Sequence, residues 1–117
     1  INNLETILIE DRIMKILRFT DPNTGRSYSG IIYLPNFNET FIDSSLKTQR
    51  KFGFKLSLQE KNPVYFNKEF YKIAEPLKDT NKFRETKIIK YVLIKDKEMN
   101  TTPSFMNISI MHYQEDE

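Results

Sequence analysis

The alternation of apolar and polar residues in the C-terminal third restricts the fold of this chain more than any other feature. Within residues 104–113, every second position is expected to face a core: Met106, Ile108 and Ile110. The preceding run, residues 84–95, is long and β-branched at its centre. A two-residue repeat is typical of a strand with one buried face. We therefore expect two strands joined as a hairpin through residues 96–103.

The first half of the chain is also predicted to form mainly strands. Residues 13–20 and 26–34 flank the turn sequence DPNTG and are predicted to pair across it. The opening segment, residues 4–12, fits a helix capped by Asn3, but its β-branched residues and short length favour a strand.

Short helices are expected between the central strands. Residues 38–52 suit a helix or a long irregular connection. Residues 54–59 alternate as a strand whose wet face carries Lys55. Residues 64–75 fit a strand followed by a turn of helix, and 76–81 a loop. The prediction is a mainly β domain with one or two short helices, built as a small five-stranded barrel that closes its own edges.

Composition limits the size of the fold and its chemistry. A chain of 117 residues holds one core, so we expect a single domain over residues 1–113 and an acidic tail over 114–117. The chain has no cysteine, a single histidine (His112), and no glycine-rich phosphate loop or loop of ordered metal ligands. We therefore predict a protein without catalytic residues, metal or cofactor. No segment has about 20 consecutive apolar residues or the pattern of a signal peptide, so the expected location is the cytoplasm and not a membrane.

Charge is distributed unevenly along the chain. Residues 47–97 contain fourteen basic and six acidic residues, net +8, whereas residues 1–46 are net −2 and residues 98–117 net −4. The basic segment also contains eight of the fifteen aromatic residues. Cations that follow a phosphate backbone and rings that stack on bases are the combination that single-strand binding requires. Most such aromatics in a small β domain are nevertheless core residues, and most lysines only solvate the surface.

The order of elements and the last third of the chain resemble a known family. The runs KIIKYV (87–92) and MNISI (106–110) are similar to the closing strands of phage single-stranded-DNA-binding proteins, which are oligonucleotide-binding (OB) barrels. The resemblance implies binding of single-stranded nucleic acid, most often DNA, in phage replication or recombination within the host cytoplasm. Tails of that family are usually longer and often end in an aromatic residue, whereas this chain ends at Glu117. Recruitment of partners through the tail is therefore not implied.

The predicted binding residues divide into rings and cations. The rings expected to stack on bases are Tyr28, Phe52, Phe54 and Tyr65. The cations expected to contact phosphates or to stack beside these rings are Arg26, Lys47, Arg50, Lys51, Lys55, Lys87 and Lys90.

Protein binding is the alternative function, for example as a small phage-encoded inhibitor or an accessory subunit. A compact apolar patch formed by Phe66, Phe70, Tyr71 and Ile73 would serve it. The sequence leaves open DNA versus RNA, the oligomeric state, and whether the chain is a fragment.

Overall fold

The computed structural model describes residues 3–46, 52–59, 61–78, 80 and 82–113. The helices are α1 (Asn3–Leu17), α2 (Glu39–Ser45) and α3 (Lys68–Ala74), with single 3-10 turns η1 (Leu34–Asn36) and η2 (Glu75–Leu77). The strands are β1 (Arg18–Thr20), β2 (Ser27–Tyr33), β3 (Phe52–Leu58), β4 (Val64–Phe66), β5 (Phe83–Lys95) and β6 (Thr101–Tyr113).

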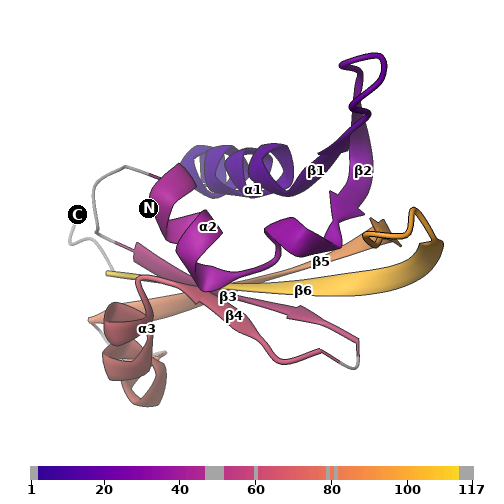
Figure 1. Cartoon of the computed structure of the whole chain (residues 1–117). Helices are drawn as coiled ribbons and strands as arrows, with labels where there is room; N and C mark the ends of the chain where they lie inside the picture. The colour runs from indigo at the N-terminus through magenta and orange to yellow at the C-terminus, as the bar shows by residue number, and fades with distance from the viewer. Residues whose placement is uncertain (1–2, 47–51, 60, 79, 81, 114–117) are drawn as a thin grey trace.

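The six strands form one curled sheet in the order β1-β2-β5-β6-β3-β4 (Figure 1). Strands β5 and β6 have 13 residues each and form the long central hairpin. Neighbouring strands are antiparallel except β2 and β5, which run parallel. The mainly β class is confirmed. The strand count is corrected from five to six, and among the described strands β1 and β4 lie at opposite edges of the sheet and do not pair.

Helices α1 and α2 cover one face of the sheet, which we call the inner face (Figure 1). Its core contains the alternate residues of β3 and β6, including Phe54, Leu56, Ile108 and Ile110. From α1 it receives Ile9, Ile13 and Leu17, each four residues from the next. This spacing places the three side chains on one side of a helix.

The strand predicted over residues 4–12 is therefore wrong, and of the strand predicted over 13–20 only Arg18–Thr20 is formed. The buried i, i+4, i+8 series outweighs the low helix propensity of the isoleucines, because propensity is a weak prior beside tertiary packing.

Both predicted hairpins are confirmed. Strands β1 and β2 pair across a turn in which the Asp21 amide donates a 2.8 Å hydrogen bond to the Arg26 carbonyl oxygen. Strands β5 and β6 pair throughout, around a turn closed by Asp96 and Asn100. Helix α2 lies in the segment predicted as a helix or an irregular connection, with the Asn38 side chain capping its start.

Helix α3 packs on the opposite, outer face of the sheet and covers only one end of it (Figure 1). Tyr71 of α3 packs there against Tyr65, Phe83 and Met111 of the sheet. Gly53 permits this close packing, since a Cβ atom there would lie 2.9 Å from the Asn67 carbonyl oxygen. The strand and helix predicted within residues 64–75 are confirmed as β4 and α3.

Candidate nucleic-acid interface

Beyond α3, the outer face of the sheet carries an exposed aromatic pair. Tyr91 of β5 and Phe105 of β6 are direct partners in the central ladder, and their ring centroids are 5.4 Å apart. The two residues are 64% and 56% exposed. Large apolar side chains this accessible on two long central strands contribute little to the core, and they offer flat surfaces to a ligand.

Two further rows of side chains cross the sheet beside this pair. The row next to it contains Ile89, Asn107 and Ser57, which pair in that order across β5, β6 and β3. The row after that contains Lys87, Ser109 and Lys55. Because successive residues of a strand point to opposite faces, each row is two residues, about 7 Å, from the next. An aromatic row, a neutral polar row and a cationic row therefore follow one another towards α3.

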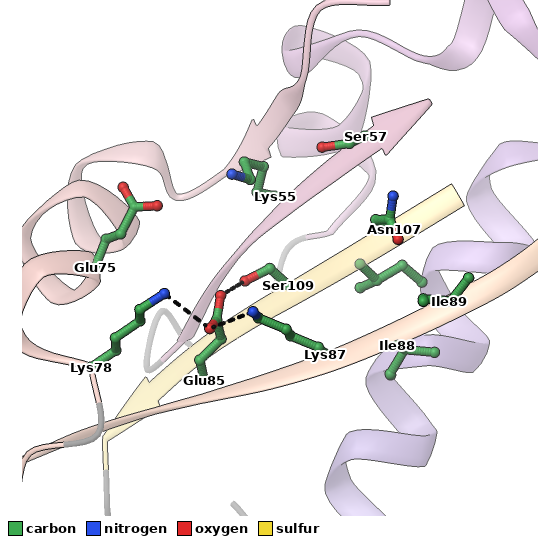
Figure 2. Close-up of a pocket in the computed structure, with 11 residues that line it drawn as sticks. Lys55, Ser57, Glu75, Lys78, Glu85, Lys87, Ile88, Ile89, Asn107 and Ser109 are labelled. Atoms are coloured by element: carbon green, nitrogen blue, oxygen red, sulfur yellow. Dashed lines mark hydrogen bonds and ion pairs between the residues drawn. The ribbon is translucent and has the colours of Figure 1, made fainter. Parts of the chain in front are cut away.

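A pocket of about 350 Å³ lies where the polar and cationic rows meet η2 and the residue after it (Figure 2). Its wall includes Lys55, Lys87 and Asn107 from the sheet and Lys78 from the segment after η2. The volume is at the small end of the range of about 300–1,000 Å³ typical of ligand sites. This pocket and the exposed ring pair form the surface that we call the outer platform: Lys55, Ser57, Lys78, Glu85, Lys87, Ile89, Tyr91, Phe105, Asn107 and Ser109.

The carboxylate of Glu85 contacts three of the polar side chains that line the pocket (Figure 2). Ser109 Oγ donates a 2.5 Å hydrogen bond to Glu85 Oε2, and Lys78 Nζ and Lys87 Nζ lie 3.4 and 3.7 Å from Oε1. Burial opposes ionisation of Glu85, but the hydrogen bond from Ser109 and the two lysines outweigh it and lower the pKa of this carboxyl. The negative charge therefore persists at neutral pH and holds the two lysines beside the pocket.

The hydrogen-bond network continues beneath α3. The Tyr71 hydroxyl lies 2.8 Å from Ser109 Oγ, and because the serine proton is used by Glu85, Tyr71 must be the donor. Burial, together with the nearby charges of Glu75 and Glu85, raises the pKa of Tyr71 despite the opposing effect of this hydrogen bond. The phenol therefore stays protonated and fixes the direction of the network from α3 towards the platform.

A second aromatic group lies at the far end of the sheet. The ring of Phe19 stacks on Tyr28 at 6.3 Å and contacts Tyr33 at 5.7 Å. Lys95 Nζ lies 4.9 Å from the centre of the Phe19 ring. Lys87, Tyr91 and Lys95 are four residues apart along β5, and an even spacing places their side chains on the same face of a strand. Phe19 itself is 6% exposed, and Tyr28 and Tyr33 are half-buried, so this group is less accessible than the ring pair of Tyr91 and Phe105.

Two of the four rings predicted to stack on bases are buried. Phe54 is fully buried in the inner core, and Tyr65 is 8% exposed beneath α3. The predictions for these two residues are corrected, because a buried ring cannot stack on a base. Phe52 and Tyr28 are half-buried, and their roles remain predictions.

The predicted cations are separated by the fold. Lys55 and Lys87 both lie on the outer platform. Lys90 lies on the inner side of the sheet, and its Nζ is 3.0 Å from Glu10 Oε2 of α1. The predicted contact of Lys90 with phosphate is therefore corrected, because this lysine forms an ion pair within the chain. Arg26 is exposed in the turn before β2. Lys47, Arg50 and Lys51 lie outside the described residues, as does the predicted tail, 114–117.

The residues at the centre of the platform were not among the predicted contacts: Ile89, Tyr91, Phe105 and Asn107. A signal for Phe105 was present, since it is out of phase with the inward series Met106, Ile108 and Ile110. The register that places Tyr91 opposite Phe105 is a long-range property that the local pattern does not contain.

The single histidine of the sequence, His112, lies in β6. His112 is 5% exposed, and its Nε2 lies 3.2 Å from Thr86 Oγ1. Within the described part of the chain, no three His, Cys, Asp or Glu side chains gather as a metal site, and no helix is long and apolar enough to cross a membrane. Comparisons with known protein families, curated proteins and solved structures found no match to this chain.

Proposed function

We propose that this chain binds single-stranded nucleic acid on the outer platform. Tyr91 and Phe105 stack on bases, while Lys55 and Lys87 contact phosphates. The observation that carries this proposal is the exposed ring pair, 64% and 56% accessible, on the two long central strands of the sheet. Stacking contributes about 1–3 kcal/mol per base and needs unpaired bases, which a duplex does not offer.

The proposal retains the function expected from the sequence but assigns it to different rings. A curled sheet whose strand faces bind oligonucleotides is characteristic of OB-like folds, and we propose that relationship here. A role in phage replication or recombination, in the host cytoplasm, belongs to the same proposal. Binding through lysines releases counterions, so the affinity is expected to fall as salt rises.

The first experiment measures fluorescence anisotropy of a labelled mixed-sequence single strand, with a duplex of the same sequence as control. Tyr91→Ala and Phe105→Ala should each weaken binding by about 1–3 kcal/mol. Ile7→Ala is the matched control, because Ile7 is 60% exposed on α1, away from the platform. Loss of binding in both ring variants but not in the control supports the proposal. Absence of single-strand binding at low salt would refute it.

A second candidate function, protein binding, is favoured by a different surface. Strand β2 pairs with β5 only at residues 93–95, so among the described strands residues 84–92 of β5 pair on one side only, with β6. An unpaired edge of this length can accept a strand from a partner. The apolar patch predicted for this function is not formed, because Phe66 and Tyr71 are fully buried. A partner bound at the edge should survive Tyr91→Ala and Phe105→Ala, which separates the two functions.

A further inference from the structure

The polar row beside the aromatic pair suggests that the platform distinguishes between bases. We infer that Asn107 reads the edge of a base next to the one stacked on Tyr91 and Phe105, and that adenine is the base it prefers. The inference rests on the proposed function and specifies its ligand. It departs from the sequence-independent binding that stacking alone would give.

The position of Asn107 supports this role. It is exposed at the centre of the outer face, two residues along β6 from Phe105, and it is flanked across the sheet by Ile89 and Ser57. Within the described residues, neither the Asn107 amide nor the Ser57 hydroxyl takes part in a side-chain hydrogen bond. Ile89 is 67% exposed and offers an apolar surface for the flat side of a base. Figure 2 shows Asn107 and Ser57 beside the pocket.

The charges around the row orient a nucleotide on it. Lys87 and Lys55 lie one row further towards α3, about 7 Å from Asn107 along the strands. Phosphates are therefore attracted to the α3 side, and bases extend towards Asn107 and the aromatic pair. Glu85 lies behind the lysines and disfavours a phosphate that enters deeper into the pocket.

The chemistry of the amide favours adenine. An asparagine side chain offers one acceptor and two donors, and it pairs bidentately with adenine N6 and N7. We infer contact with the N6–N7 edge, because on the Watson–Crick edge cytosine N4 and N3 offer the same donor and acceptor order as adenine N6 and N1. On the edge that carries N7, guanine presents two acceptors, O6 and N7, which leaves the amide oxygen of Asn107 facing an acceptor, and the pyrimidines have no N7.

The test compares oligo-dT strands whose central nucleotides are replaced by dA, dC or dG, in competition with a labelled oligo-dT. We expect the dA strand to compete about tenfold better than unmodified oligo-dT, the scale of one bidentate contact. Asn107→Ala should abolish that difference, so that the dA strand competes no better than unmodified oligo-dT. Asn107→Asp, which keeps the shape but removes the donors, should abolish it too. Asn23→Ala is the control, because Asn23 is an exposed asparagine in the turn between β1 and β2, outside the platform, and this variant should retain the preference.

The outcomes separate this inference from the proposed function. Equal competition by all strands, with binding still lost in Tyr91→Ala, overturns the reading by Asn107 and leaves the proposed function standing. A preference for dG that survives Asn107→Ala also overturns it, because the neighbouring Lys87 would then be the reading residue. No binding to any strand overturns both.

Discussion

The two faces of the sheet are built from the same strands but differ in how far helices cover them. On the inner face, Phe54, Leu56, Ile108 and Ile110 are no more than 1% exposed beneath α1 and α2. On the outer face, α3 covers only one end, and Ile89, Tyr91 and Phe105 remain more than half exposed. Helix coverage, and not strand composition, therefore determines which apolar side chains stabilise the fold.

This difference shows where function can reside. Residues on the inner face are constrained by packing, since each loss of volume leaves a cavity. The exposed residues of the outer platform, such as Tyr91 and Phe105, carry no such constraint, yet they include large rings that a purely solvating surface does not need. The comparison predicts that stability and binding can be changed separately.

The largest expected effect comes from a pair of phenylalanine substitutions, one on each face. Phe54→Ala should lower the free energy of unfolding by about 3–5 kcal/mol, because it empties a fully buried site. Phe105→Ala should change it by no more than about 0.5 kcal/mol, as at other surface positions. Urea unfolding followed by circular dichroism measures both. A similar cost for the two variants would mean that the outer ring pair is part of the core.

The next effect concerns the end of the outer face that α3 covers. Gly53→Ala should destabilise the chain by about 1–3 kcal/mol, because the added methyl group meets the Asn67 and Phe66 carbonyl oxygens at 2.9 and 3.1 Å. Gly25→Ala is the control for backbone strain alone, since nothing lies near its Cβ position and its φ is +72°. Hydrogen exchange of α3 amides should rise in Gly53→Ala only. Unchanged protection there would show that α3 does not depend on this close approach.

A third prediction concerns acid stability and the Ser109 network. Ser109→Ala removes a hydrogen bond from Glu85 and from Tyr71 and should cost about 1–3 kcal/mol at neutral pH. The pKa of Glu85 is lower in the folded chain than in the unfolded chain, where it is about 4.3. The ionised carboxylate therefore stabilises the fold fully at pH values above the unfolded pKa. This stabilisation is lost as the pH falls through the folded pKa.

Unfolding measured in steps from neutral pH to below pH 4 tests the prediction. The wild type should lose more stability over this range than Ser109→Ala or Glu85→Gln, whose acid dependence should be reduced. An identical slope in all three proteins would show that the Glu85 carboxyl is not stabilised by its contacts in the folded chain.

The local parts of the fold could be predicted from the sequence. The inward series of β6 and the turn segments of both hairpins are local patterns, and they led to the correct strands. Helix α1 was missed because Ile7 and Ile9 favour a strand locally, although Ile9, Ile13 and Leu17 already had the spacing of a buried helical side. The sixth strand and the open order of the sheet depend on long-range pairing that no short segment specifies.

The site was predicted as a type of surface but not as a set of residues. Basic and aromatic residues do share the outer platform, and Lys55 and Lys87 lie there, but its exposed rings are Tyr91 and Phe105 and not the predicted ones. Residue type does not show that Phe54 is buried and Phe105 exposed, since both are phenylalanines in strands. The difference arises from which part of the sheet the helices cover. The position of α3 on the sheet depends on tertiary packing and cannot be predicted from a short segment.

The smallest effect gives the most direct test of the two faces, because it uses lysines only three residues apart. Lys87 is on the outer platform with a side chain 71% exposed, whereas Lys90 is paired with Glu10 on the inner side. Lys87→Ala should weaken single-strand binding and reduce the salt slope of the affinity by about 1, with little change in stability. Lys90→Ala should cost about 0–1 kcal/mol of stability and leave the salt slope unchanged. If Lys90→Ala reduces the slope as much as Lys87→Ala, nucleic acid does not bind the outer face selectively.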